Sequence, residues 1–532
     1  MSAQVPERRT RRWVWVCVLA AASLLFAAAT IAAFRPGGYN SDVFFQLKQA
    51  EGLVPFNDWH PVIQAWLWQG LIALTGTPAA MLALQVGVLA AAAFGLSWYL
   101  YDTSGSRRIS LLGLAVVACP WVLTFAGMLW KDSQMMVALF AAVSCTLLAS
   151  RFPRAKWPLL AAGLLLLVYG VMVRKNAAFA AIPLAWLMTI VALTGTRLAS
   201  WAARLRLPRT REGLRALWRP WAGLAAGTLV LAGLVAGGSK AVDVATQPEH
   251  TSQLTQVFLD DVAFTMSTAE IKQTAMPERL RTDLLQIRTT CPRTGGDHIS
   301  DAYWRCYRPD AHPGYRKLDD ADAIAQLWAD QVTSHPLRYL RYRTLVYSRF
   351  LFATDYQFQT SMRKNSFGIR IADPQAHGIL AAYVNDFGVQ TLRWPFQTWF
   401  WFAAGFLALG LAGRMRSFRR TALCLSASSV IYLLGYFPIV PAFNFRYTYW
   451  SAAALTIVAA LGIADALMRR RSATVPEAPA GRDVQAGRPA VPEAPDGEDV
   501  RAGRPAMPEA PDGEDVRADR PAMPEAPDGE GT

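Results

Sequence analysis

The chain has 532 residues, of which 53% are hydrophobic and only 17% are charged, and its formal net charge at pH 7 is +14. A soluble protein of this length rarely has so apolar a composition, so most of the core is predicted to be helix solvated by lipid. The positive charge does not indicate a nucleic-acid-binding face. The Lys and Arg residues lie between apolar blocks, which is the distribution that membrane topology imposes.

Ten apolar blocks, each about 17–24 residues long, follow one another along the chain. A helix of that length crosses the ~30 Å of hydrocarbon in a bilayer. The blocks are residues 13–34, 78–101, 110–128, 134–150, 157–173, 177–194, 221–238, 396–413, 421–437 and 450–467. We therefore expect an all-α polytopic membrane protein with about ten transmembrane helices. The basic run 8–12 and the absence of a convincing cleavage site make the first block an uncleaved anchor, with the N-terminus in the cytoplasm.

The apolar stretch 61–75 is too short to be counted among these helices. Its fifteen residues cover only about 22 Å, and they include Gln64 and Gln69. If this stretch crossed the membrane, the basic loops that follow it would lie outside the cytoplasm. As an interfacial or re-entrant helix it leaves every basic loop in the cytoplasm, and the charge distribution favours that interpretation.

This topology divides an inner-membrane protein into four parts, with both termini in the cytoplasm. Residues 1–238 form an N-terminal transmembrane module whose external loop, 35–77, carries interfacial juxtamembrane helices. Residues 239–395 form a soluble periplasmic insertion large enough for a small folded domain, and 396–470 hold the last transmembrane helices. The tail 471–532 repeats a sixteen-residue unit of Pro, Ala, Gly and charged residues, so we expect it to be disordered and to have no catalytic role.

The six cysteines fall into two groups. Four lie in apolar segments, where we expect inert packing residues: Cys17, Cys119, Cys145 and Cys424. Cys291 and Cys306 lie in the insertion, outside the cytoplasm, where disulfides persist. We expect these two to be joined.

Four polar clusters lie at the external ends of the expected helices, and lipid anchoring does not explain them together. They are Gly38–Glu51 with Phe56–Pro61, Trp130–Asp132, Arg174–Asn176 and Phe443–Trp450. Three of the four place Lys or Arg on the outer side, against the positive-inside bias. Any one cluster is explained equally well as caps and snorkelling side chains, but all of them together favour a shared external cavity. Its cations would suit a phosphate or pyrophosphate, which Arg174 and Arg446 can bind through planar guanidinium forks.

The first external loop supplies the acidic candidates. Asp42 opens a segment, 42–53, in which Val43, Phe44, Leu47 and Ala50 can form one helical stripe, so we expect an interfacial helix capped by Ser41 or Asp42. Asp58 or His60 could cap the next helix, with Pro61 at its first position. His60 is the only histidine outside the insertion.

In this order, these motifs resemble the GT-C superfold of membrane glycosyltransferases that use polyprenyl-phosphate sugars, such as protein O-mannosyltransferases and the bacterial lipid A aminoarabinose transferase. The matching residues are Asp42, Phe56–Pro61, Trp130–Asp132, Arg174–Asn176 and Arg446-Tyr447. The resemblance covers about residues 1–240 and 396–467. It reaches neither the insertion nor the tail.

The resemblance implies an inverting transfer, outside the cytoplasm, from a polyprenyl-phosphate sugar donor to a glycan, lipid or protein acceptor of the cell envelope. Asp42 takes the position of the base. Many relatives have a second acidic residue where Val43 stands, so a second acid would be Asp58 or Asp132. The residues expected at the lipid phosphate are Lys131, Arg174, Lys175, Arg446 and Tyr447, and His60 is a further site candidate. Some relatives use a divalent metal ion; this sequence has no ligand cluster that demands one.

Three other functions are compatible with parts of the sequence. A transporter or flippase for lipid-linked sugars would also need cations near a phosphate, but transporters more often show repeated halves and charges near the bilayer midplane. An O-antigen or polysaccharide ligase or polymerase often has a large external loop late in the chain, as 239–395 is. A scaffold acting through its tail would leave the outer charges without a purpose. The aromatic residues Tyr303, Trp304, Tyr307 and Tyr315 either stack on sugar rings or form the core of the insertion, and we favour the core.

Overall fold

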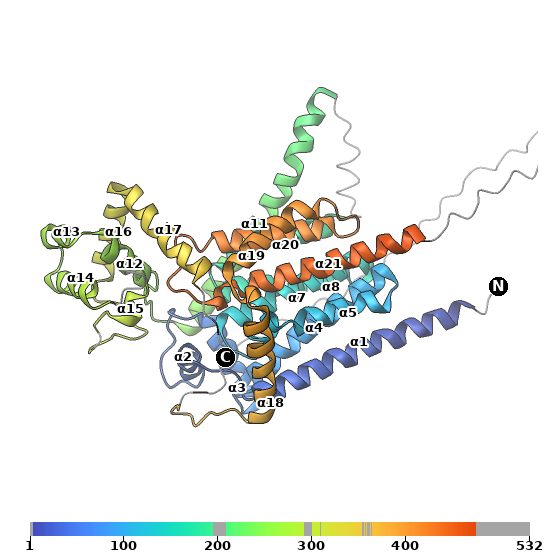
Figure 1. Cartoon of the computed structure of the whole chain (residues 1–532), viewed down its shortest axis with the longest axis horizontal. Helices are drawn as coiled ribbons and strands as arrows, with labels where there is room; N and C mark the ends of the chain where they lie inside the picture. Colours follow the sequence, from blue (N-terminus) through green and yellow to red (C-terminus); the bar gives the residue numbers. More distant parts are fainter. Residues whose placement is uncertain are drawn as a thin grey trace, which may run out of the picture. The chain divides into compact units, whose positions relative to one another are not determined.

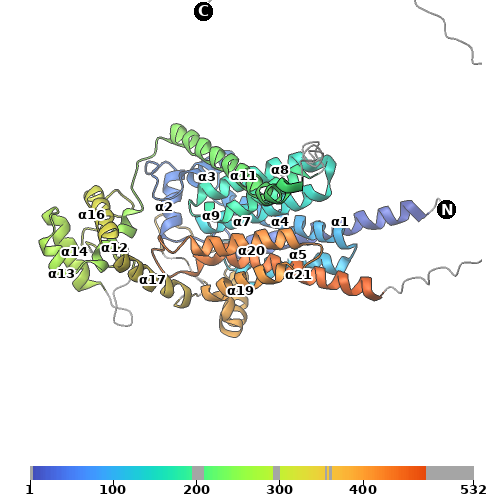
Figure 2. The ribbon, with the colours of Figure 1, turned by 90° about the horizontal axis from the view of Figure 1, so that it is seen from above.

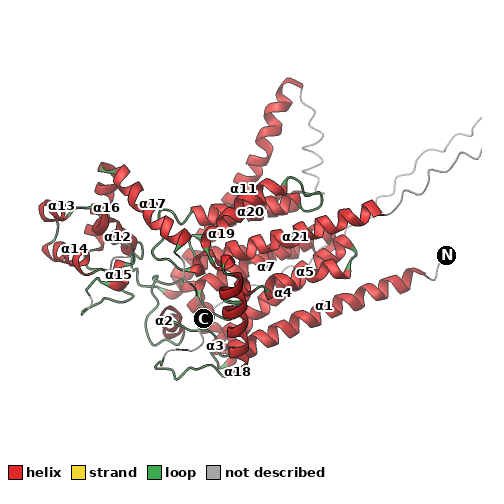
Figure 3. Ribbon diagram, in the orientation of Figure 1, coloured by secondary structure: helices red, strands yellow, loops and turns green. Residues whose placement is uncertain are grey.

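The structure, a computed structural model, describes residues 4–194, 209–291, 300–308, 310–353, 356, 358, 362 and 364–474. These residues form helices and loops, and no strand is found among them (Figure 3). The predicted tail lies almost wholly outside the described residues.

The helices up to the insertion are α1 (Gln4–Phe34), α2 (Ser41–Ala50), α3 (Val62–Thr75), α4 (Ala80–Ser104), α5 (Arg107–Ala118), α6 (Pro120–Leu123), α7 (Lys131–Arg151), η1 (Pro153–Ala155), α8 (Lys156–Val173), α9 (Ala177–Leu193) and α11 (Arg209–Thr246). The insertion contributes α12 (Thr255–Thr265), α13 (Thr268–Gln273), α14 (Glu278–Thr290), α15 (Ala302–Arg305), α16 (Ala321–Ser334), α17 (Pro336–Phe352), α18 (Pro374–Ala382), η2 (Tyr383–Leu392) and η3 (Trp394–Phe396). The chain then forms α19 (Thr398–Ala412), α20 (Arg419–Leu434), η4 (Phe445–Thr448) and α21 (Tyr449–Thr474).

Six helical segments of the described chain are long and apolar enough to cross a membrane, which indicates a multi-pass membrane protein. They are Arg12–Phe34, Ala80–Ser104, Lys131–Arg151, Pro153–Val173, Gly223–Thr246 and Phe445–Ser472. Three of the other expected spans form the shorter helices α9, α19 and α20, of 17, 15 and 16 residues. Ten spans are therefore not established by helix length.

The expected span 110–128 is not one helix. It breaks at Cys119-Pro120 into α5, of twelve residues, and the four-residue α6. A proline inside a helix removes a backbone hydrogen bond and its ring clashes with the preceding turn. Pro120 instead starts α6, so the prediction of a continuous nineteen-residue span was wrong.

Helix α7 is the centre of the bundle, with most of its side chains buried. It packs against α4, α8, α9 and α21, and Figures 1 and 2 show α4, α7 and α21 running along one another. Small residues and buried polar groups make this packing close: the Ser144 hydroxyl donates to the carbonyl oxygen of Ala92 at 2.8 Å, and Ser428 donates to that of Ala180 at 2.6 Å. Such interhelical hydrogen bonds satisfy hydroxyls that lipid would leave without partners.

The insertion has a hydrophobic core of its own, but this core is smaller than the expected domain 239–395. It is formed by residues between 259 and 327, with Trp59 of the first loop added to it. Helix α11 continues to Thr246, past the expected boundary, and α17 packs on the bundle through Val346 and Phe350. Figure 1 shows α12 to α16 grouped beyond one end of the bundle, with α17 leading back to it.

A disulfide joins Cys291, at the end of α14, to Cys306, at the end of α15. Both cysteines are buried, and their Cα atoms are 5.2 Å apart, within the normal range for a bridge. The other four cysteines are free.

We predict that the denatured, non-reduced protein reacts with a maleimide at four cysteines and that the reduced protein reacts at six, as counted by mass spectrometry. The double variant Cys291→Ser/Cys306→Ser should lose up to about 3 kcal/mol of stability in the insertion, since the bridge restricts the unfolded chain. Cys424→Ser, which removes an unpaired thiol, is the control. Labelling of all six cysteines without reductant would contradict the bridge.

Candidate functional site

A cavity of about 650 Å³ lies at the end of the bundle that faces the insertion. Its walls come from the loop before α2, the end of the first loop, the start of α7, the α8–α9 turn, the insertion and η4. All four polar clusters that the sequence singled out contribute to this lining. The residues that meet here from the expected list are Asp42, His60, Lys131, Arg174, Arg446 and Tyr447.

Buried glutamines hold the loop that leads into Lys131. Gln64 of α3 donates to the carbonyl oxygen of Leu129 at 2.8 Å. Gln85 of α4 donates to those of Ala126 and Met128 at 2.6 and 3.1 Å, and Gln134 of α7 in turn donates to Gln85 at 2.7 Å. Three helices therefore fix the backbone in front of α7.

The first loop is joined to that same backbone at Gly38. The Gly38 N–H donates to the carbonyl oxygen of Gly127 at 2.8 Å, and the Leu129 N–H donates to that of Gly38 at 3.1 Å. A Cβ on Gly38 would clash with the Met128 side chain and lie 3.1 Å from the Met128 Cα, so a larger residue would require that side chain to move and the two backbones to separate slightly. This close approach places the start of α2 beside the start of α7.

Helix α2 has the buried stripe expected of it but a different cap. Its N-cap is Asn40, whose side-chain oxygen accepts from the Val43 N–H at 3.1 Å. The predicted caps Ser41 and Asp42 are both inside the first turn of the helix. Asp42 therefore has no capping role, and its carboxylate lies in the cavity wall.

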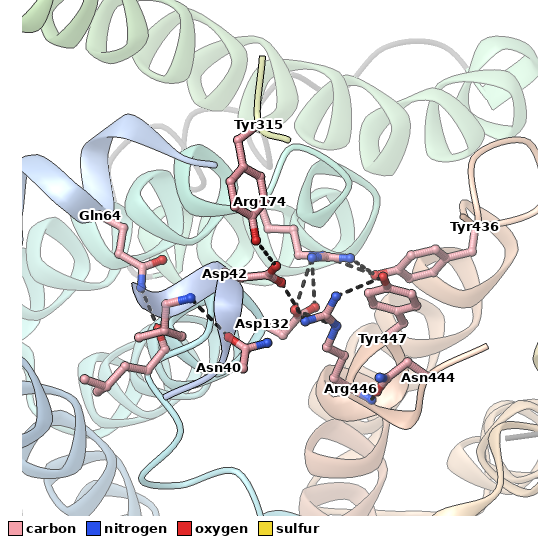
Figure 4. A network of polar contacts seen from close by, with 12 residues as sticks. Asn40, Asp42, Gln64, Asp132, Arg174, Tyr315, Tyr436, Asn444, Arg446 and Tyr447 are labelled. Carbon is pink, nitrogen blue, oxygen red and sulfur yellow. Dashed lines mark hydrogen bonds and ion pairs between the residues drawn. The ribbon is translucent and has the colours of Figure 1, made fainter. Parts of the chain in front are cut away.

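Asp42 makes one contact with each of its oxygens. Oδ2 accepts from Nη1 of Arg446 at 3.0 Å, and Oδ1 accepts from the hydroxyl of Tyr315 at 3.3 Å. Figure 4 shows the carboxylate lying between these two side chains. Burial would raise the pKa of Asp42, but the charges of Arg446 and Lys131 and the hydrogen bond from Arg446 hold it well below the ordinary value. Asp42 is thus ionised at neutral pH.

Asp132 is fully buried in the first turn of α7 and serves as the shared counterion of two arginines. Nη1 of Arg174 lies 3.0 and 3.1 Å from its two oxygens, and Nε of Arg446 lies 4.0 Å from Oδ2. The ring of Tyr447 lies 4.9 Å from the Cζ of Arg174 and 5.1 Å from that of Arg446. Asp132 does not line the cavity itself. Its carboxylate therefore holds the two arginines from behind the cavity wall.

Tyr436, in the turn that follows α20, is a partner of this cluster that the sequence did not reveal. Its hydroxyl accepts from Nε and Nη2 of Arg174 at 3.2 and 2.9 Å, and its ring stacks on that of Tyr447. Figure 4 shows both tyrosines beside the two guanidinium groups. A tyrosine at the end of an apolar block has no pattern that predicts such a contact.

Lys131 lines the cavity beside this cluster. Within the described part of the chain, no carboxylate oxygen lies within 4 Å of its ammonium group. The three cations of this wall, Lys131, Arg174 and Arg446, thus face two carboxylates, Asp42 and Asp132, which leaves a formal charge of +1 on this side; the other carboxylate of the lining, Asp301 of the insertion, is paired with Arg305 at 3.2 Å. The cavity is suited to an anion.

His60 is 3% exposed and lines the cavity. Neither ring nitrogen has a hydrogen-bond partner among the described residues, and the ring lies 5.0 Å from that of Tyr315. Burial lowers the pKa of His60 to about 3, and the charge of Lys131 acts in the same direction. The imidazole is therefore neutral at physiological pH.

Besides Asp132, two of the expected site residues, Asp58 and Lys175, lie outside the cavity lining. Asp58 accepts from the backbone N–H and the hydroxyl of Thr251 at 2.7 and 2.6 Å and from the ring of His250 at 3.0 Å. Its pKa is lowered by these hydrogen bonds, although burial opposes them. Asp58 thus joins the first loop to the insertion, and Lys175 is exposed elsewhere. Neither Asp58 nor His60 caps α3, which follows Pro61 without a side-chain cap.

The donor set of the cavity does not fit a divalent metal ion. Across the described residues, no group of three or more His, Cys, Asp and Glu side chains is arranged to hold one. The three carboxylates at the cavity, Asp42, Asp132 and Asp301, are each paired with an arginine. We derive no step through a metal.

We predict that Asp132→Asn lowers the stability of the detergent-solubilised protein by about 3–5 kcal/mol, because it leaves the buried guanidinium group of Arg174 without its counterion and removes the second carboxylate beside Arg446, which keeps Asp42. The control is Asp102→Asn. Asp102 also pairs with two arginines, Arg12 and Arg151, but their guanidinium groups are largely exposed, so the loss should be about 1 kcal/mol or less. Thermal unfolding measures both variants. Equal losses of stability in the two variants would show that Asp132 is not a buried counterion.

Comparisons of the chain with protein-family models, with curated proteins and with solved structures return no match.

Proposed function

We propose that this protein is an integral-membrane glycosyltransferase of the GT-C type, which moves a sugar from a polyprenyl-phosphate donor to a cell-envelope acceptor with inversion. The observation that carries the proposal is the cavity in which an ionised carboxylate, Asp42, stands beside three cations. The cations suit the phosphate of the donor, and the carboxylate suits an attacking hydroxyl.

The chemistry needs little beyond orientation and charge. An acceptor hydroxyl attacks the anomeric carbon, the bond from that carbon to the phosphate oxygen breaks, and its electron pair leaves with the polyprenyl phosphate. The hydroxyl proton passes to Asp42. Lys131, Arg174 and Arg446 stabilise the charge that gathers on the phosphate.

The pair between Asp42 and Arg446 links these two events. Arg446 keeps the pKa of Asp42 low in the unliganded cavity, so the carboxylate is ionised but weakly basic. A phosphate that draws the guanidinium toward itself weakens the pair and raises the proton affinity of Asp42. The base thus gains strength when the donor is bound.

We place the cavity on the periplasmic side of a bacterial inner membrane, with about ten spans and both termini in the cytoplasm. Two ion pairs support a basic, cytoplasmic end opposite the cavity. Asp102, at the end of α4, pairs with Arg12 of α1 and with Arg151 at the end of α7. The cavity lies at the other ends of α1 and α7, so the basic residues gather away from it.

The contacts of α3 support its assignment as a helix that does not cross. It begins directly after His60, in the cavity wall. Near the start of the next helix, α4, Gln85 bonds to the loop before α7, which leads into the cavity. Near the end of α4, Asp102 pairs with Arg151 at the opposite end of the bundle. Both ends of α3 therefore lie at the cavity end of the bundle, as an interfacial or re-entrant helix requires.

The proposal predicts that Asp42→Asn lowers transfer by about two to four orders of magnitude at unchanged expression, the usual range for a positioned base. The change keeps the size of the side chain, and Asn40, not Asp42, caps α2. The measurement is restoration of the envelope glycan profile of a deletion strain by the plasmid-borne variant. Asp58→Asn lies outside the cavity and keeps a side-chain oxygen that can accept from Thr251, so it should retain transfer. A deletion strain whose glycans are unchanged, or full restoration by Asp42→Asn, would contradict the proposed function.

Lys131→Gln should raise the KM for the polyprenyl-phosphate donor by roughly 10-fold or more, with little change in the KM for the acceptor, since it removes a cation that no carboxylate of the described residues pairs with. Lys131→Arg should recover part of the loss. Lys175→Gln removes a cation from the neighbouring motif that lies outside the cavity, and is the matched control. Equal effects of Lys131→Gln and Lys175→Gln would place the phosphate elsewhere.

A further inference from the structure

The cavity wall opposite the arginines has a different chemistry. It is built by the first loop and by the insertion. Its aromatic half, as we define it, consists of Trp59, His60, Trp304 and Tyr315, with Gln253 and Gln256 beside them. The insertion residues among these lie outside the motifs that resemble a known family.

Trp304 is the most open aromatic residue of this half. It is 41% exposed, although its ring is held on several sides. His312 stacks on it with centroids 5.0 Å apart and an interplanar angle of 25°, and Tyr315 and Trp59 contact it at 5.2 and 5.8 Å. A large ring fixed in place with two-fifths of its surface open is a platform for a ligand rather than part of a core.

The other aromatic residues of the same sequence segment show the contrast. Tyr303 and Tyr307 are each 1% exposed and belong to the hydrophobic core of the insertion. The segment therefore divides: two rings stabilise the insertion, and Trp304 and Tyr315 face the cavity.

His60 adds an observation that points to a ligand. Its imidazole is nine-tenths buried or more, lines the cavity, and has both nitrogens without a partner among the described residues. A buried polar group without a hydrogen bond costs free energy, and most such groups in folded proteins are paired. Both nitrogens are covered in this structure, so a small movement of the ring would bring one of them to a ligand hydroxyl, which would donate to one nitrogen or accept from the other.

Flat rings combined with planar polar groups suit one class of ligand. A pyranose ring has a face of C–H groups that packs on an indole and a rim of hydroxyls that bond with amides and imidazole. The cavity volume of about 650 Å³ is within the roughly 300–1,000 Å³ of sites for small organic ligands. An extended peptide is typically bound through hydrogen bonds to backbone groups, whereas this wall consists of side chains. A purely apolar ligand would leave His60 without a hydrogen-bond partner.

We infer that the aromatic half is an acceptor subsite for a carbohydrate ring, so that the hydroxyl to be glycosylated belongs to a sugar of an envelope glycan or glycolipid. The identification of the bound sugar as the acceptor rests on the proposed function. Asp42 lies where such a subsite requires it, with Tyr315 of the aromatic half on one oxygen and Arg446 of the cationic half on the other (Figure 4).

The test measures transfer and binding separately. Trp304→Ala should raise the acceptor KM roughly tenfold or more, with donor KM and slow donor hydrolysis unchanged, and Trp304→Phe should recover part of the loss. Trp394→Ala, which removes a 63% exposed tryptophan of the insertion outside the cavity, is the matched control. Thermal unfolding checks that each variant is folded.

For binding, the solubilised protein is applied to an array of bacterial envelope oligosaccharides, some free and some lipid-linked. We expect the Asp42→Asn variant to be retained on carbohydrate and the Trp304→Ala variant to lose this retention. The free and the lipid-linked probes distinguish a glycan ligand from a glycolipid ligand. Transfer to a polypeptide, or identical behaviour of Trp304→Ala and Trp394→Ala, would overturn the subsite while leaving the transferase intact. Carbohydrate retention without any donor turnover would support the subsite and overturn the proposed function instead.

Discussion

The arrangement of the cavity depends on one buried carboxylate that two arginines share. Arg174 follows α8 and Arg446 precedes α21, and both turn toward Asp132 at the start of α7. A guanidinium group buried without a counterion costs several kcal/mol, so Asp132 favours the arrangement in which the ends of these three segments meet. The ring of Tyr447 between the arginines fixes their planes. The cationic wall is thus a consequence of how the bundle closes, before any ligand is considered.

A second constraint keeps the loops at this end rigid. Apolar helices offer few partners to a polar backbone, yet the turn before α7 has carbonyl groups that must be paired. Gln64 and Gln85 provide those partners from α3 and α4, and Gly38 allows the first loop to approach closely enough to bond to the same turn. Asp42 follows Gly38 by only four residues, so the position of its carboxylate is set by the backbone contact and by the Asn40 cap rather than by its own hydrogen bonds.

Local patterns in the sequence predicted what depends on local physics. Apolar runs located most of the long helices, and charges at their ends located the polar half of the cavity, because neither requires knowledge of distant contacts. The block 110–128 was misjudged because composition hides the break that Pro120 imposes. Gln64 counted against a spanning helix, but its partner on the α7 turn could not be inferred. Tyr315 lies 273 residues from Asp42 in the chain, and no periodicity connects them. Only the folded insertion brings the two together.

The insertion therefore completes the cavity as well as extending it. The bundle alone provides cations and Asp42, which is enough to bind an anion and to take up a proton, but it presents little surface that would distinguish one attacking hydroxyl from another. Tyr315 and Trp304 supply that surface, and Asp58 ties the first loop to Thr251 so that the two walls keep a fixed spacing. Under the proposed function, the bundle determines the chemistry of the donor phosphate, and the insertion determines which acceptor is presented to Asp42. The choice of acceptor would then change through the insertion without any change in the cationic wall.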